Sequence, residues 1–131
     1  MENIRSFIPK DKHDLESVNR LKELNPAMLK PVLPDLFEWV QDINWPVARG
    51  IAQILVSCGR EMIPELKKVL ESNDDDWKFA CFGWIINDLP LEIVKELEPE
   101  LKRIANQPSI IERDYELDDR AKNILKAISR P

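Results

Sequence analysis

The sequence contains a single histidine, three glycines and two cysteines among 131 residues. One histidine excludes a metal site built from several histidines and leaves no Ser-His-Asp set for nucleophilic catalysis. Few glycines, many Leu, Lys and Glu, and no run of alternating β-branched residues argue against a substantial β-sheet. We therefore expect an all-α protein that is not an enzyme and has no catalytic, metal or cofactor site.

The two cysteines, Cys58 and Cys81, lack the CxxC spacing of redox or metal motifs, and both lie in apolar surroundings. Two buried, reduced thiols are therefore favoured over a disulfide, which is typical of a reducing compartment. No apolar run approaches the ~20 residues that a membrane span requires. These observations predict a cytoplasmic protein without a membrane partner.

The charge balance is acidic, with 24 acidic and 19 basic residues and a net charge of −5. Generic binding to nucleic acid is disfavoured because phosphates would be repelled overall. The chain is 44% apolar, which is enough for one continuous core at this length. We expect residues 1–131 to form a single domain.

Residues 42–58 have the pattern of an amphipathic helix. Asn44 is placed to cap its first turn, and Pro46 suits a position just inside it. Gly59 follows where a left-handed C-terminal cap is favoured. The apolar residues on one face of this helix are Val47, Ile51, Ile54, Leu55 and Cys58.

Two patterns recur along the chain. A Pro-acid-Leu motif begins at Pro34, Pro64 and Pro99, with spacings of 30 and 35 residues. The Trp45 segment (residues 42–48) has an echo 32 residues later around Trp77 (residues 74–80). Two helical segments per period are typical of stacked helical hairpins. The sequence therefore predicts a short α-solenoid of stacked antiparallel helical hairpins, which is a HEAT-like fold.

The predicted units follow from these repeats and from local capping signals. Asp14 is expected to cap the first helix, and the acids at residues 74–76 are expected at the start of a later one. Pro90 should break that helix, and residues 106–116 are predicted to be a loop. The units are an N-terminal arm at 1–13, hairpin repeats at 14–41, 42–71 and 74–105, and a C-terminal capping helix at 117–130.

Trp45 and Trp77 are the most informative candidates for contact with a partner. Indoles at the first turns of consecutive repeats would offer apolar area and an N–H donor along one edge of the stack. The alternative is that both wedge between hairpins as core residues. Nearby carboxylates would steer a basic partner. The predicted partner-binding residues are Asp42, Asn44, Trp45, Asp74, Asp75, Trp77 and Lys78.

A second acidic segment admits two interpretations. It is either a solvated loop with helix-capping acids or an acidic contact surface for a basic partner. The residues of this segment are Glu112, Asp114, Glu116, Asp118 and Asp119.

Two rival functions use other residues. A nucleic-acid-binding repeat protein would place Lys67, Lys68, Lys102 and Arg103 on phosphates, against the overall charge. An enzyme would need Asp42, Asp74 and Asp88 to meet in one pocket.

Four segments together resemble a family of small bacterial proteins of unknown function with HEAT-like helical repeats. They are Pro9-Lys10-Asp11-Lys12-His13-Asp14-Leu15, Asp42-Ile43-Asn44-Trp45-Pro46-Val47-Ala48, Asp76-Trp77-Lys78-Phe79 and Asn106-Gln107-Pro108-Ser109. The resemblance implies a short stack of helical hairpins and brings no activity and no small-molecule substrate. Analogy of size and fold extends to immunity partners of bacterial toxins. The hypothesis is thus a non-enzymatic protein-binding module, with an inhibitor or toxin-immunity protein as its more specific form.

Overall fold

The computed structural model describes residues 3–129, and this range is all-helical, with no strand. The α-helices are α1 (Leu15–Lys22), α2 (Leu33–Glu38), α3 (Ala48–Ser57), α4 (Ile63–Glu71), α5 (Asp75–Trp84), α6 (Leu91–Val94), α7 (Glu98–Asn106), α8 (Ile110–Asp114) and α9 (Leu117–Ile128). The 3₁₀ segments are η1 (Ile4–Phe7), η2 (Pro26–Val32), η3 (Gly59–Met62), η4 (Ile86–Asp88) and η5 (Lys95–Leu97). The predicted all-α class is confirmed. Residues 1 and 2 of the predicted arm and residue 130 of the predicted capping helix lie outside the described range.

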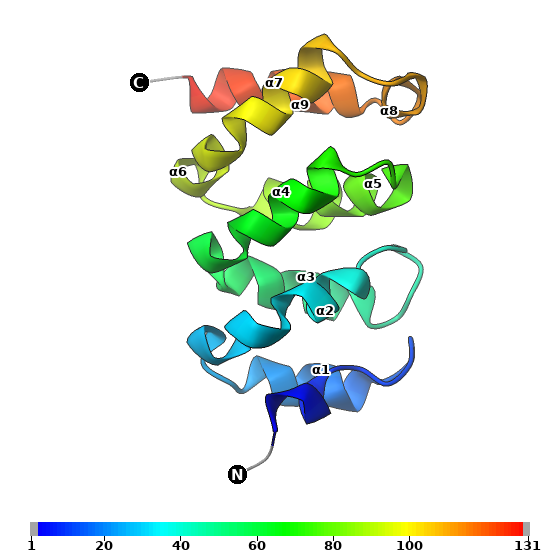
Figure 1. Cartoon of the computed structure of the whole chain (residues 1–131), viewed down its shortest axis with the longest axis vertical. Coiled ribbons are helices and arrows are strands. Elements are labelled where there is room, and N and C mark those ends of the chain that lie inside the picture. The colour runs from blue at the N-terminus through cyan, green and yellow to red at the C-terminus, as the bar shows by residue number, and fades with distance from the viewer. Residues whose placement is uncertain (1–2, 130–131) are drawn as a thin grey trace.

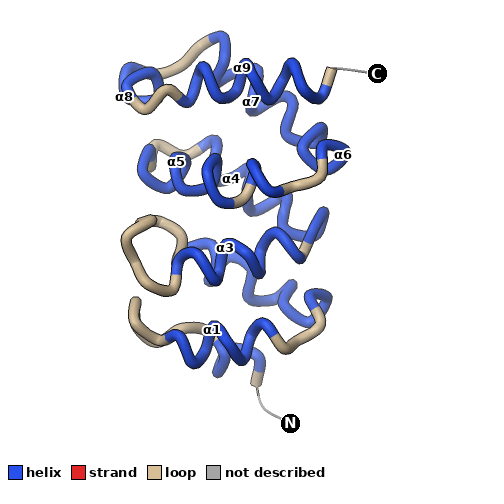
Figure 2. The backbone as a smooth tube through the Cα atoms, turned by 180° about the vertical axis from the view of Figure 1, so that it is seen from behind, coloured by secondary structure: helices blue, strands red, loops and turns tan. Residues whose placement is uncertain are grey.

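The helices follow one another along the long axis of the molecule, from α1 at one end to α7 and α9 at the other (Figure 1). α1 packs on α3, α3 on α5, and α5 on α9, and these helices lie on one side of the molecule (Figure 2). α2 packs on α4 and α4 on α7, which form the other side. One continuous hydrophobic core, from Val18 to Ile128, lies between the two sides.

The three repeated prolines each begin a helix. Pro34, Pro64 and Pro99 stand in the first turns of α2, α4 and α7, and a 3₁₀ segment precedes each of these helices. Proline is tolerated there because the first-turn amide hydrogens have no partner inside the helix. The predicted role of the proline motif as a helix start is confirmed.

Other local predictions are also confirmed. Asp14 Oδ1 accepts the Ser17 N–H at 3.1 Å and caps α1. Asp74 Oδ1 accepts the Trp77 N–H at 3.1 Å and caps α5. Gly59 has φ 59°, the left-handed conformation expected after α3. Cys58 and Cys81 are free and buried, and burial raises the pKa of both thiols.

The predicted start of the central helix is wrong. α3 begins at Ala48, and residues 42–47 form a loop in which Asp42 Oδ1 accepts the Asn44 N–H at 2.8 Å. The cause is twofold, since an Asp side chain stabilises such a turn and a proline disfavours helical backbone in the residue before it. Trp45, which precedes Pro46, therefore lies on a loop and not in a first helical turn.

The prediction of a loop over residues 106–116 is also wrong, because it contains α8. Ser109 Oγ accepts the Glu112 N–H at 3.0 Å, and Glu112 Oε1 accepts the Ser109 N–H at 2.8 Å. This reciprocal pair is a capping box, whose sequence signature is Ser-x-x-Glu.

Within residues 3–129, no helix has the length and apolarity that crossing a membrane requires.

Candidate functional site

A groove of about 700 Å³ lies where the loop before α3, the start of α5 and the α8–α9 corner meet. Figure 1 shows these three segments at the same edge of the molecule. The groove is lined by Gln41, Asp42, Ile43, Asn44, Trp45, Asp74, Asp76, Phe79, Asp114, Tyr115 and Glu116. Five of these residues carry carboxylates, three are aromatic, and none is lysine, arginine or histidine. We call it the acidic groove.

Four of the seven predicted contact residues line the acidic groove. They are Asp42, Asn44, Trp45 and Asp74. The other three, Asp75, Trp77 and Lys78, lie outside its lining. The structure thus brings the predicted residues of the loop before α3 together with Asp74, and it places the predicted residues within α5 outside the groove.

The two tryptophans have different surroundings. The Trp77 indole N–H donates to the Phe37 carbonyl at 2.9 Å, which ties α5 to α2. The Trp45 ring packs edge-on against Trp39, with centroids 5.6 Å apart. Both rings are partly buried against the core, but within residues 3–129 the Trp45 indole N–H makes no hydrogen bond. Trp77 therefore has its donor satisfied internally, whereas Trp45, which lines the groove, has an indole donor without a partner in residues 3–129.

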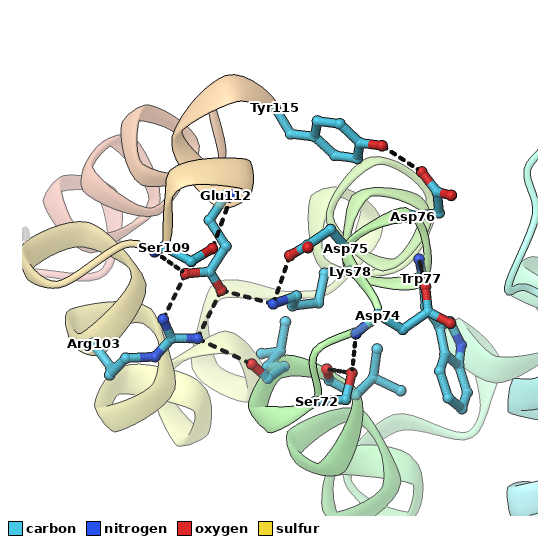
Figure 3. Close-up of polar contacts among 12 residues, drawn as sticks. Ser72, Asp74, Asp75, Asp76, Trp77, Lys78, Arg103, Ser109, Glu112 and Tyr115 are labelled. Carbon is cyan, nitrogen blue, oxygen red and sulfur yellow. Dashed lines mark hydrogen bonds and ion pairs between the residues drawn. The ribbon is translucent and has the colours of Figure 1, made fainter.

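Lys78 is not available to a partner, because only 3% of it is exposed. Its ammonium lies 2.8 Å from Glu112 Oε2 and 2.9 Å from Asp75 Oδ1 (Figure 3). A buried charge requires such compensation, since desolvation is otherwise too costly. The predicted contact role of Lys78 is corrected to an internal ion pair, and Asp75 serves the same network.

Glu112 is the centre of this network. Both terminal nitrogens of Arg103 donate to its carboxylate, at 2.6 and 2.7 Å, and Lys78 donates at 2.8 Å. Burial by itself raises the pKa of Glu112. The hydrogen bonds from Arg103, Lys78 and the Ser109 amide lower it by more than burial raises it, so the pKa is about 2. The carboxylate is therefore ionised at neutral pH. It fixes α8 to α5 and α7, and so positions residues 114–116 at the groove.

The groove carboxylates at the start of α5 and in the loop before α3 are held in place. Asp42 Oδ1 accepts the Asn44 N–H, and Asp74 Oδ1 accepts the Trp77 N–H. Asp76 Oδ1 accepts the Tyr115 hydroxyl at 2.6 Å (Figure 3). In the part of the chain that the structure describes, Oδ2 of these three residues makes no hydrogen bond. Each acid is oriented and still has an acceptor oxygen for a ligand. The hydrogen bond to Asp76 also raises the pKa of Tyr115.

The aromatic wall joins α5 to the α8–α9 corner. Phe79 and Tyr115 pack edge-to-face with centroids 5.7 Å apart, and the Arg120 guanidinium lies 5.1 Å from the Phe79 centroid. Sequence reasoning did not select Asp76, Phe79 or Tyr115 as contact residues. It did identify Asp114 and Glu116 as a candidate acidic surface, but it gave no reason to join them to the Trp45 loop.

The cluster of three aspartates that an enzyme would need is not formed. Asp42 and Asp74 line the groove, but Asp88 lies in η4, beyond the C-terminal end of the helix that Asp74 caps. Among residues 3–129, no group of three or more His, Cys, Asp or Glu side chains could hold a metal ion.

The candidate phosphate-binding cations are mostly engaged with acids. Lys68 lies 3.1 Å from Glu65, and Lys102 lies 2.7 Å from Glu98. Arg103 is the partner of the buried Glu112. Three of the four candidate cations therefore have an acidic neighbour, and two of these three pairs lie at the exposed surface.

The fold and the groove define an all-helical protein with an acidic, aromatic-walled recess at one edge. The sequence model of the protein family DUF5071, a domain of unknown function, matches residues 7–125. The chain belongs to this family. No curated protein matches the chain.

Proposed function

We propose that the protein is a non-enzymatic protein-binding module whose partner inserts a basic segment into the acidic groove. The single observation that supports this most strongly is the groove lining, which has five carboxylates and no basic side chain. The groove volume of about 700 Å³ lies within the roughly 300–1,000 Å³ typical of ligand sites. Three rings add the apolar area that binding energy requires.

The charge of the whole chain supports the same partner. A net charge of −5 would attract a basic protein from a distance and steer it toward the acidic edge. Such steering is weakened by salt, since charges further apart than about 10 Å are largely screened at 0.1 M ionic strength. Binding should therefore weaken as salt rises.

The proposal places this site on a short α-solenoid of HEAT-like hairpins. The row of helices and the three proline-started helices support that assignment. Repeat folds of this type present extended edges and faces to protein partners. In its more specific form, the proposal describes an inhibitor or toxin-immunity protein of the bacterial cytoplasm that masks a basic surface on its target.

The test is a pull-down from lysate with the wild-type chain and two charge-matched double variants. Asp114→Asn with Glu116→Gln removes two groove carboxylates that make no hydrogen bond or ion pair within residues 3–129. Glu23→Gln with Glu92→Gln removes two exposed carboxylates elsewhere. α6, which carries Glu92, lies at the opposite edge (Figure 1). Both variants change the net charge by the same amount.

The proposal predicts that a basic protein is retained by the wild type at low salt and released at high salt. The Glu23→Gln, Glu92→Gln variant should also retain it. The groove variant should lose most of it. Equal retention by the two double variants would contradict the groove as the binding site. Circular dichroism of both variants checks that the fold is unchanged.

A further inference from the structure

The acidic groove has more features for recognition than negative charge, because it combines oriented carboxylates with aromatic rings. The inference drawn from this combination rests on the proposed function and names the side chain that the groove recognises.

The carboxylates can accept a planar fork of donors. Asp74 caps α5 and Asp76 stands in its first turn, and each uses Oδ1 internally. The remaining Oδ2 atoms are held on the same helix end by those bonds. Guanidinium carries five N–H donors in a fixed plane, which suits several oriented oxygens at once, whereas ammonium is a compact and strongly hydrated point charge.

The rings favour the same ligand. Trp45 and Tyr115 each pack edge-to-face with another ring, so in each pair at most one ring face is covered by its partner. Guanidinium stacks on aromatic faces more readily than ammonium does. The chain itself shows this preference, because the cation–ring contacts within residues 3–129 are made by Arg20, Arg49 and Arg120.

The second large cavity lacks these properties. It has a volume of about 810 Å³ and lies beside Lys78, Arg103 and Glu112. There the two cations neutralise the carboxylates of Glu112 and Asp75. Of these two cavities in residues 3–129, the acidic groove is the one that combines carboxylates without a cation partner and aromatic rings.

We propose that the acidic groove binds an arginine side chain of the partner's basic segment. Its guanidinium donates to Asp74 and Asp76 and stacks on the Trp45 and Tyr115 rings. Lysine at the same place keeps the charge attraction but loses the planar hydrogen bonding and the stacking.

The experiment compares two peptides, Ac-Gly-Arg-Gly-Arg-Gly-amide and its lysine counterpart, by NMR titration of the ¹⁵N-labelled full chain at low salt. The reporter is the indole N–H signal of Trp45, which is one of four tryptophans and is assigned with Trp45→Phe. We expect the arginine peptide to shift this signal saturably and to bind at least about threefold more tightly than the lysine peptide. Asp76→Asn should weaken arginine binding, and Glu92→Gln, in α6, should leave it unchanged.

Equal affinity for the two peptides, or shifts confined to signals away from the groove, would overturn the inference. These failures are separable from failure of the proposed function. If the pull-down depends on Asp114 and Glu116 while the peptides bind equally, the protein-binding site stands and the arginine preference falls. If the pull-down is indifferent to those carboxylates, the proposed function fails and the inference falls with it.

Discussion

Glu112 is the least exposed charged side chain in the described part of the chain. Its carboxylate is the shared acceptor of Lys78 and Arg103, so its removal would leave the Lys78 ammonium buried with Asp75 alone. Breaking a buried ion pair from one side costs about 3–5 kcal/mol. Glu112→Ala should lower the free energy of unfolding by that amount, as measured by urea denaturation at neutral pH.

The control for this prediction is Glu92→Ala. Glu92 is exposed in α6 and makes no ion pair within residues 3–129, so its loss should change the free energy of unfolding by less than about 0.5 kcal/mol. If Glu112→Ala is as mild as the control, the network does not hold α8 in place.

The same residue makes stability depend on pH. The pKa of Glu112 is lowered from 4.5 to about 2 in the folded chain. A lowered pKa stabilises the fold above the unfolded value, so this contribution is complete above pH 4.5 and is lost as pH falls toward 2. The difference corresponds to about 3 kcal/mol. The stability gap between the wild type and Glu112→Gln, from urea midpoints, should therefore narrow over that interval. A gap that is constant with pH would contradict the assignment.

Residue by residue, the sequence predicted caps better than buried charges. Asp14 and Asp74 cap as predicted because capping depends only on the next three residues. Sequence alone predicts Lys78 at the surface, because Asp75 is its only near neighbour in the ion-pair network and Glu112, the partner it meets in the interior, lies 34 residues further along the chain. Compensation of a buried lysine is a tertiary property, and periodicity cannot show it.

At the scale of elements, the α8–α9 corner combines strain with the groove. Glu116 has φ 60°, a left-handed conformation that costs a side chain with a Cβ roughly 1–2 kcal/mol. Strain that persists at a candidate site is consistent with a functional constraint. Glu116 is exposed and lines the acidic groove, which is the site of the proposed function.

Glu116→Gly should therefore raise the free energy of unfolding by about 0.5–1 kcal/mol, because glycine adopts this conformation without strain. The gain is smaller than the strain itself, because glycine also increases the conformational entropy of the unfolded chain. It should also weaken partner retention in the pull-down. Glu116→Gln, which keeps the strain, should weaken retention with no gain in stability. Stabilisation without any change in retention would separate Glu116 from the binding site.

The same scale shows where sequence reasoning fell short. The Ser-x-x-Glu signature at residues 109–112 was present, but proline and charge in the segment favoured the prediction of a loop. The Asn-Trp-Pro segment resembles a helix start, but an aspartate two residues before Asn44 and a proline after Trp45 both favour a turn. In both segments, one local signal favoured a helix and another favoured a loop or turn, and the prediction rested on the signal that the structure does not bear out.

For the whole molecule, the spaced prolines predicted where three of the helices begin, because each stands in the first turn of a helix of its own. The groove was not predictable in the same way. It joins residues 41–45, 74–79 and 114–116, which meet only after the helices have packed in a row. Trp45, Asp42 and Asp74 could be selected from the first two segments alone, and the third was recognised only as a separate acidic surface.

The proposed function requires that the acidic groove holds the basic partner. The most direct measurement is the amount of partner recovered by the Asp114→Asn, Glu116→Gln chain relative to the Glu23→Gln, Glu92→Gln chain, at equal salt and equal bait. We predict a severalfold lower recovery by the groove variant, and a difference that shrinks as salt screens the wild-type interaction. Equal recovery by the two chains would show that the partner binds elsewhere and would contradict the claim.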